Sequence, residues 1–194
     1  MRRFTIDTKC LAGYNENGHV DRDVEALVEA ARKGEADIAM LASSSSEVHP
    51  CGQHLARFAD FRKRMIDVGL GTIFLLPPLA KHGFTFPGFG VLGDEVTVHR
   101  ERLVFKVLFP GMHSRWSDYA AAKGLDRKDI ASPDAWKWRG RLGDVQAFWA
   151  HEYNRRDVFV TCDECFGRLP DHPEFSRAMV VTPSQAMHML TVSG

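Results

Sequence analysis

FTID, at residues 4–7, predicts a short apolar strand that ends in an acidic residue. An unbroken apolar run from Ile38 to Ala42 predicts a second strand, of the kind found in a sheet covered on both faces. Further strands are expected at 72–76, 158–161 and 178–181. Because helical segments separate these strands, we predict an α/β fold, a three-layer α/β/α sandwich with a mostly parallel central sheet.

The expected helices follow from apolar spacing and from end signals. Apolar residues recur at helical spacing between 21 and 33, and Gly34 is a fitting end. Other helices are expected within 53–68 and over 144–155. Thr182-Pro183 predicts a short C-terminal helix, with threonine as N-cap and proline at the first helical position.

The middle of the chain, residues 79–138, is predicted to be an insertion or an elaborated edge of a single domain that spans 1–194. Glycines and prolines near its start indicate loops. Residues 95–98 and 102–108 are predicted as the two strands of a hairpin, and residues 117–123 as a helix.

Composition narrows the class of protein. The 194 residues are 44% hydrophobic and 26% charged, which is typical of a globular domain. Lys plus Arg equals Asp plus Glu at 25 each, so the net charge is zero. This balance argues against binding of nucleic acid over the whole surface, and it does not exclude a local basic groove.

No apolar run is long enough to cross a membrane, and the charged start lacks a signal-peptide core. We therefore expect a cytoplasmic protein whose four cysteines are thiols.

Four acidic residues are placed at the ends of expected elements. Asp7, Glu47 and Asp163 follow strands, and Asp144 is expected to open the helix that leads into the fourth strand. The carboxyl ends of parallel strands share one edge of a sheet, where ligand sites lie. Clustered carboxylates repel one another unless a cation lies between them, and hard oxygen ligands favour Mg²⁺ or Mn²⁺. The pattern predicts a metal site able to act on a phosphodiester.

Five segments resemble the ordered motifs of the PIN-domain family. They are IDTKCL at 6–11, SSSSE at 43–47, GDVQAFWAH at 143–151, VFVTCDECF at 158–166 and AMVVTPSQAMHML at 178–190. Each motif is weak alone, and the order of the motifs on matching elements makes the resemblance moderately specific. It covers the two ends of the chain and leaves out the middle.

The resemblance implies a PIN-like, metal-dependent endoribonuclease, a hydrolase that cuts RNA. The metal-binding and catalytic residues would be Asp7, Glu47, Asp144 and Asp163, with Thr8 and Thr161 as supporting hydroxyls. One biological setting in the family is the toxin of a toxin–antitoxin pair. An antitoxin protein would then occupy the acidic groove, often through an inserted basic side chain, and a homodimer is also expected from the family.

The chain departs from the family pattern at Lys9, where many members carry Asn two residues after the first Asp. A lysine there would pair with a carboxylate, contact phosphate or disturb the metal site. The alternative hypothesis is therefore a catalytically inactive PIN-like module that binds RNA or protein. Affinity for metal discriminates between the two hypotheses, because only an intact site is stabilised by Mn²⁺.

The cysteines suggest another reading. Cys162 and Cys165 have the spacing of a zinc half-site, as do Cys51 and His54, so a structural zinc could join the pairs. A buried thiol at a strand end, however, needs no metal. The acids also have ordinary alternatives: helix caps and turns account for any one of them taken singly.

Two basic runs are candidates for contact with phosphate, Arg62–Arg64 and residues 137–141. The second run mixes Trp136 and Trp138 with cations just before the GDVQ motif, a mixture that suits single-stranded nucleic acid. Arg139 and Arg141, together with Lys9, are the predicted substrate contacts. The alternative is a solvated loop with its tryptophans packed inward.

Overall fold

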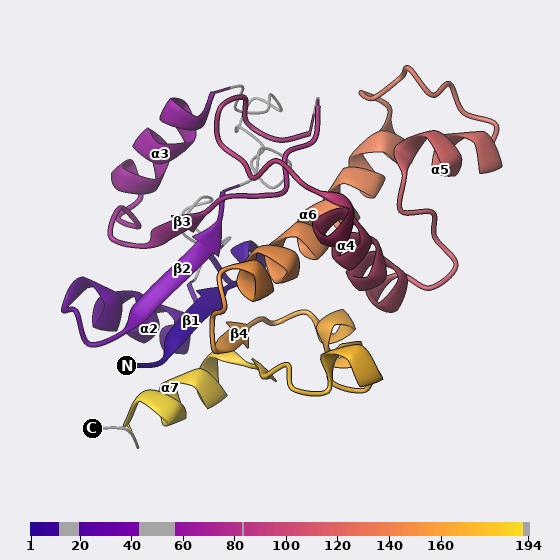
Figure 1. Cartoon of the computed structure of the whole chain (residues 1–194). Coiled ribbons are helices and arrows are strands. Elements are labelled where there is room, and N and C mark those ends of the chain that lie inside the picture. The colour runs from indigo at the N-terminus through magenta and orange to yellow at the C-terminus, as the bar shows by residue number, and fades with distance from the viewer. Residues whose placement is uncertain (12–19, 43–56, 83, 192–194) are drawn as a thin grey trace.

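The structure is a computed structural model that describes residues 1–194 except 12–19, 43–56, 83 and 192–194 (Figure 1). Its strands are β1 (Arg3–Ile6), β2 (Asp37–Leu41), β3 (Phe74–Leu76), β4 (Val158–Val160) and β5 (Val180–Val181). Its α-helices are α2 (Arg22–Arg32), α3 (Phe58–Asp67), α4 (Glu95–Leu108), α5 (Trp116–Ala122), α6 (Pro133–Tyr153) and α7 (Pro183–Thr191). Three short 3-10 turns are η1 (Thr8–Leu11), η2 (Glu164–Arg168) and η3 (Pro173–Phe175). The five strands predicted outside the middle of the chain are confirmed.

The strands form one sheet in the order β3-β2-β1-β4-β5, with β1 at its centre. Every neighbouring pair is parallel. Ile6 of β1 is in register with Val160 of β4, and the Asp7 N–H continues the ladder by donating to the Val160 carbonyl at 2.8 Å. The carboxyl ends of the strands therefore meet at one edge, as the prediction of a parallel sheet requires.

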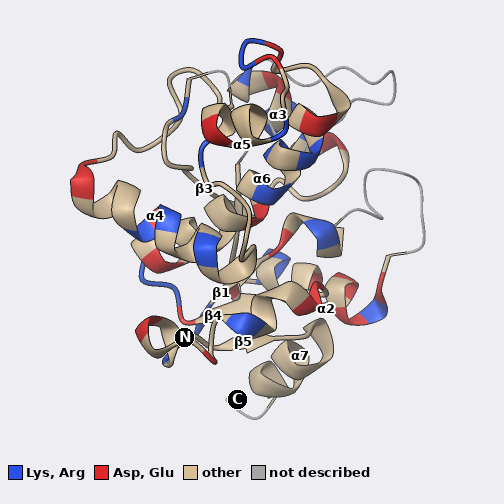
Figure 2. Ribbon diagram, turned by 90° about the vertical axis from the view of Figure 1, so that its right-hand side faces the viewer, with Lys and Arg blue, Asp and Glu red and all other residues tan. Residues whose placement is uncertain are grey.

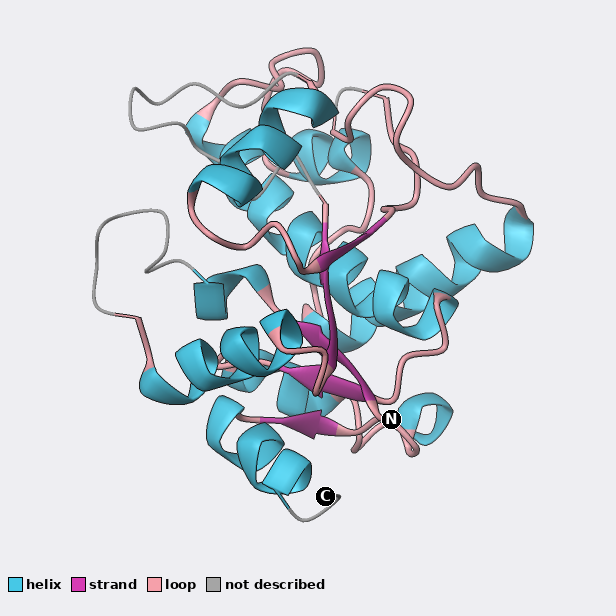
Figure 3. Cartoon of the chain, turned by 90° about the vertical axis from the view of Figure 1, so that its left-hand side faces the viewer, coloured by secondary structure: helices cyan, strands magenta, loops and turns pink. Residues whose placement is uncertain are grey.

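Helices cover both faces of this sheet, which confirms the three-layer prediction (Figure 3). One apolar core joins the sheet to α4, α5 and α6, and the other joins it to α2, α3 and α7. Side chains of β1 alternate between the two cores: Phe4 and Ile6 belong to the second, while Thr5 contacts His151 of α6. The strands are thus buried on both sides, which explains their unbroken apolar runs.

Capping residues set the ends of two predicted helices. The Asp21 carboxylate accepts hydrogen bonds from the Asp23 and Val24 N–H groups at 2.9 and 3.2 Å and so begins α2. Gly34 follows this helix with φ of 74°, a left-handed conformation that glycine adopts without strain. At α7, the Thr182 hydroxyl accepts from the Gln185 N–H at 3.3 Å, as the Thr-Pro signal predicts.

The predicted hairpin at 95–98 and 102–108 is wrong, because these residues form the single helix α4. Its start is fixed by Asp94, whose carboxylate accepts from the Thr97 N–H at 2.8 Å. The buried positions 101, 104, 105 and 108 recur every three or four residues, which is the spacing of one helix face. The β-branched residues in this stretch favour strands locally, and packing against α6 outweighs that preference.

The prediction that Asp144 opens a helix is also wrong. Helix α6 is 21 residues long and begins after Ser132, whose hydroxyl accepts from the Ala135 N–H at 3.3 Å. Asp144 lies in its second half, so it is not an N-cap. Residues 79–138 contain α4, α5 and the first turns of α6, and α4 packs along α6. None of the helices in the described part of the chain has the length and apolar character needed to span a bilayer.

Candidate functional site

The hydroxyl of Thr161 joins the exits of β1 and β4 and also holds the segment that follows β4. Asp7 directly follows β1 and is 1% exposed. The Thr161 hydroxyl, just after β4, donates to Asp7 Oδ2 at 2.8 Å and accepts from the Asp163 N–H at 3.0 Å. These bonds fix the Asp7 carboxylate and set where the chain carrying Asp163 leaves the sheet.

Helix α6 brings a third acid to the same place. Asp144 is buried on this helix, and the ammonium group of Lys9 lies between it and Asp163. Lys9 Nζ is 3.1 Å from Asp144 Oδ1 and 2.5 Å from Asp163 Oδ2. We use the name acid cluster for Asp7, Asp144 and Asp163. Two strand exits and a helix thus contribute one carboxylate each.

The turn η1 directs Lys9 onto the acid cluster. The Cys10 N–H donates to the Asp7 carbonyl at 3.0 Å, which folds the chain back directly after β1. The Lys9 N–H lies 3.4 Å from Asp7 Oδ1, and the Lys9 side chain is 46% exposed. Thr8 begins this turn. Of the roles considered for Lys9 from the sequence, the structure displays pairing with the carboxylates.

Burial makes two of the three carboxylates hard to ionise. Burial raises the pKa of Asp7, although the hydroxyl of Thr161 and the charge of Lys9 work in the opposite direction. Burial also raises the pKa of Asp144 to about 6, and the charge of Lys9 only partly offsets this effect. The negative charge of Asp7 adds to the rise at Asp144.

Asp163 behaves differently. Burial alone would raise its pKa, but hydrogen bonds from the Lys9 ammonium and the Cys165 N–H lower the pKa to about 2. Desolvation would lower the pKa of Lys9, yet its contacts with Asp163 and Asp144 raise it. Lys9 is therefore charged and compensates mainly Asp163. At Asp7 and Asp144, burial raises the pKa more than the charge of Lys9 lowers it.

The acid cluster fits a hard divalent cation in its donor chemistry. Its three members are carboxylates, whose oxygen atoms are the donors that Mg²⁺ prefers. Among the described residues, no three His, Cys, Asp or Glu side chains are arranged to hold a metal ion. The Lys9 ammonium stands in for part of a cation's charge here. Glu47, the fourth predicted ligand, lies outside the described residues.

The predicted substrate contacts Arg139 and Arg141 lie in different surroundings. The segment 137–141 is helical, as part of α6, and not a loop. Arg141 Nη1 is 3.9 Å from Asp144 Oδ2, so this guanidinium lies beside the acid cluster. Arg139 is 9% exposed and lies over the rings of Phe84 and Trp136, and burial lowers its pKa. Figure 2 shows basic and acidic segments interspersed over the helices.

The tryptophans of this segment are not both available for base stacking. Trp138 is 2% exposed, and its indole N–H donates to the His113 carbonyl at 3.0 Å. Its ring lies 6.2 Å from that of Phe105 on α4. Trp138 is therefore a core residue that joins α6 to α4, as the inward-packing alternative expected.

One feature of the site was missed from the sequence. Cys10 Sγ lies 3.3 Å from Cys162 Sγ, so two thiols meet beside the acid cluster. Only the adjacency of β1 and β4 places the two residues together, and the sequence alone does not show that adjacency. In the described part of the chain, Cys162 and Cys165 do not belong to a metal-binding group. The other predicted zinc pair, Cys51 and His54, is not among the described residues.

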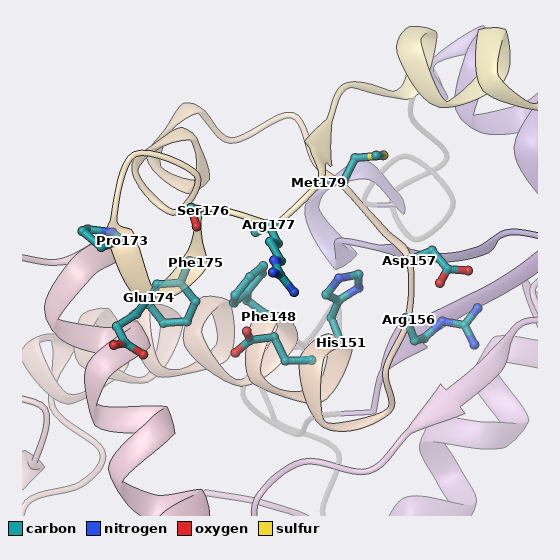
Figure 4. A pocket seen from close by; sticks show the side chains of 12 residues that line it. Phe148, His151, Arg156, Asp157, Pro173, Glu174, Phe175, Ser176, Arg177 and Met179 are labelled. Carbon is teal, nitrogen blue, oxygen red and sulfur yellow. The ribbon is translucent and has the colours of Figure 1, made fainter.

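A separate pocket of about 390 Å³ lies at the opposite edge of the sheet (Figure 4). Asp157, which precedes β4, and Met179, which precedes β5, line it, so it opens at the amino ends of these strands. Phe148, His151 and Phe175 line it as well. The pocket is therefore distinct from the acid cluster.

The buried His151 makes the stability of the fold depend on pH. Its Nδ1 lies 3.0 Å from the hydroxyl of Thr5, and burial, followed by the charge of Arg156, lowers its pKa to about 3. The folded protein thus keeps His151 neutral, whereas the unfolded chain protonates it near pH 6.5. The free energy of unfolding therefore decreases as pH falls below that value. His151 alone should lower it by about 2 kcal/mol between pH 6.5 and pH 5.

His151→Gln tests this expectation. Glutamine keeps a polar partner for Thr5 and does not titrate. Urea unfolding at pH 6.5 and pH 5 should show a smaller loss of stability in the variant than in the wild type. Equal losses in the two proteins would mean that His151 does not resist protonation in the fold.

Comparisons with models of protein families, with curated proteins and with solved structures found no match to this chain.

Proposed function

We propose that the protein is a metal-dependent endoribonuclease of the PIN-like kind. The observation that carries the proposal is the convergence of three carboxylates, two of them buried with raised pKa values, at the carboxyl edge of a parallel sheet. Burying ionisable acids lowers the stability of the fold, and such groups cluster where chemistry is performed. Asp7, Asp144 and Asp163 would hold Mg²⁺ or Mn²⁺, with Glu47 as the fourth ligand from the resemblance.

The surrounding residues have defined tasks in this proposal. The Thr161 hydroxyl orients the Asp7 carboxylate by donating to Oδ2. When bound, the metal would lower the pKa of a water molecule and offset the charge of the phosphodiester. Lys9 and Arg141 supply positive charge beside the acid cluster, where a phosphate would lie. Arg139 is held against two aromatic rings and is the weakest of the predicted substrate contacts.

The proposed partners come from the family resemblance: an RNA substrate, an antitoxin protein and a second copy of the chain. In that family an antitoxin often inserts a basic side chain into the acidic groove. Here Lys9 occupies the acid cluster from within the same chain. A partner that covers this site would therefore compete with, or displace, Lys9.

A second candidate function is a PIN-like module that binds RNA or protein without cleaving it. The position of Lys9 favours it, because an ammonium group between Asp144 and Asp163 supplies the cluster with a resident cation. In that case Lys9 offsets part of the charge of the acid cluster without metal.

Cleavage of a mixed single-stranded RNA pool with Mn²⁺ or Mg²⁺ tests the proposed function. The wild type should cut, EDTA should stop it, and Asp7→Asn, purified identically, should fold and not cut. Asparagine keeps an oxygen to accept the Thr161 hydrogen bond, so the variant removes the charge and little else. A single-stranded DNA pool run in parallel distinguishes a ribonuclease from a general nuclease.

The opposite result separates the two candidates. If neither protein cuts and Mn²⁺ leaves the melting temperature unchanged, the nuclease proposal fails and the binding module is favoured.

A further inference from the structure

The two thiols beside the acid cluster are arranged to react with each other. Cys10 lies in η1 after β1, and Cys162 lies after β4, so they are held by neighbouring parallel strands. Their sulfur atoms are 3.3 Å apart, whereas a disulfide bond is about 2.05 Å long. Closing the gap between the two sulfur atoms would join them in a disulfide.

The two cysteines differ in access, as an oxidised thiol and its resolving thiol do. Cys162 is exposed and Cys10 is buried beneath it. An oxidant from solvent therefore meets Cys162 first, and the thiol of Cys10 is in contact with Cys162. The nearby Cys165 is partly exposed, and burial, followed by its hydrogen bond with Asp163, raises its pKa to about 12. Burial, followed by the hydrogen bond with Cys162, raises the pKa of Cys10 as well, so the contact between the two sulfur atoms, and not their pKa values, selects the pair.

We propose that Cys10 and Cys162 are a peroxide-responsive dithiol whose disulfide locks the exits of β1 and β4. In the first step the sulfur of Cys162 attacks a peroxide oxygen, which breaks the O–O bond and gives a sulfenic acid and one water. In the second step the sulfur of Cys10 attacks the sulfur of Cys162 and displaces the second water. Two thiols and one hydrogen peroxide thus give one disulfide and two waters.

The disulfide would act directly on the acid cluster. Cys10 follows Lys9 in the chain, and Cys162 precedes Asp163. A disulfide between them would tie the segment that carries Lys9 to the segment that carries Asp163. Lys9 Nζ and Asp163 Oδ2 are already 2.5 Å apart. This clamp keeps Lys9 on the cluster and so weakens binding of a divalent cation. That consequence rests on the proposed function, whereas formation of the disulfide does not.

The test uses the full-length Cys165→Ser variant, which keeps the proposed pair. Trypsin cuts after Lys9 and Arg22 and after Arg156 and Arg168, so Cys10 and Cys162 fall in different peptides. After treatment with hydrogen peroxide, mass spectrometry should find these two peptides linked, with the whole protein lighter by about 2 Da, and dithiothreitol should reverse the change. When Cys10→Ser is added to this variant, Cys162 should instead retain a sulfenic acid that dimedone traps.

Other products would overturn the proposal. They are a persistent sulfenic acid at Cys162 while Cys10 is present, a disulfide to Cys51, or a disulfide between Cys162 and Cys165 in the wild type.

Mn²⁺ titration of oxidised and reduced Cys165→Ser then tests the clamp, with weaker binding expected in the oxidised form. Equal, measurable affinities would refute the clamp alone. An absence of binding in both forms would refute the clamp together with the proposed function, and the peptide link would still report on the dithiol.

Discussion

Asp144→Asn is expected to lower the proposed RNA cleavage by about 10³-fold, because loss of the proposed metal ligand would remove several kcal/mol of transition-state stabilisation. The same substitution should leave the metal-free protein at least as stable as the wild type. Asparagine has nearly the same shape as aspartate and carries no charge that burial would penalise. Loss of activity together with unchanged or higher stability is the signature of a functional acid rather than a structural one.

The sign of the stability change follows from the pKa of Asp144. Its value of about 6 in the folded protein lies above the ordinary value of 3.8. The ionised carboxylate therefore destabilises the fold at pH 7.5, by about 3 kcal/mol at most when a shift of this size is converted to free energy. The penalty shrinks as pH falls through 6 and is absent below 3.8. The stability difference between the variant and the wild type should thus be largest at pH 7.5.

Asp134→Asn is the matched control. Asp134 lies on the same helix, α6, and pairs with Lys123 at 3.6 Å. It should leave cleavage unchanged. A clear loss of stability in Asp144→Asn at pH 7.5 would contradict the account, because Asp144 would then be a structural partner of Lys9.

Lys9→Met is expected to tighten the binding of Mn²⁺ by about 10- to 100-fold, a gain as large as the loss that follows when a group supporting a metal ligand is removed. The ammonium of Lys9 repels a divalent cation at the acid cluster and occupies the space between two of its carboxylates. Methionine keeps a side chain of similar length without the charge. Because Lys9 is 46% exposed, solvent screens part of the repulsion, and the lower end of this range is expected.

Lys63→Met controls for the loss of a surface charge. Lys63 pairs with Asp67 at 2.6 Å within α3, and both side chains are exposed. Calorimetric titration should show no change in Mn²⁺ affinity for this variant. If Lys9→Met binds Mn²⁺ no better than the wild type, Lys9 does not compete with metal. The second candidate function, a module that binds RNA or protein without cleaving it, then gains support.

The sheet was predictable because local and global signals agree there. Buried parallel strands need apolar side chains on both faces, so Ile38–Ala42 and Val158–Val160 are visible as apolar runs. Thr182-Pro183 is a helix start that depends on local chemistry alone.

The same local reasoning failed where tertiary packing decides. In α4, β-branched residues suggested strands, whereas burial of Val104, Phe105 and Leu108 against α6 selects a helix. In α6, Gly143 before Asp144 suggested a helix start, although Ser132-Pro133 carries the signal that was recognised at Thr182. A glycine inside a helix costs only about 1 kcal/mol, which packing readily offsets.

The meeting of Asp7 and Asp163 at one edge of the sheet was predictable, whereas the contacts around them were not. The positions of Asp7 and Asp163 follow from strand ends in a parallel sheet. Where the Lys9 ammonium points, and that Cys10 meets Cys162, depend on the turn η1 and on which strands are neighbours. Neither is encoded in a short stretch of sequence.

The most direct test of the central claim is to count the Mn²⁺ ions that the protein binds. Electron paramagnetic resonance measures free Mn²⁺, so titration of wild type and Asp144→Asn at pH 7.5 reports binding without any assumption about substrate. The account predicts at least one Mn²⁺ bound by the wild type at micromolar to millimolar concentrations and clearly weaker binding by the variant. Wild-type protein that leaves as much Mn²⁺ free as the variant does would contradict a metal site at these carboxylates.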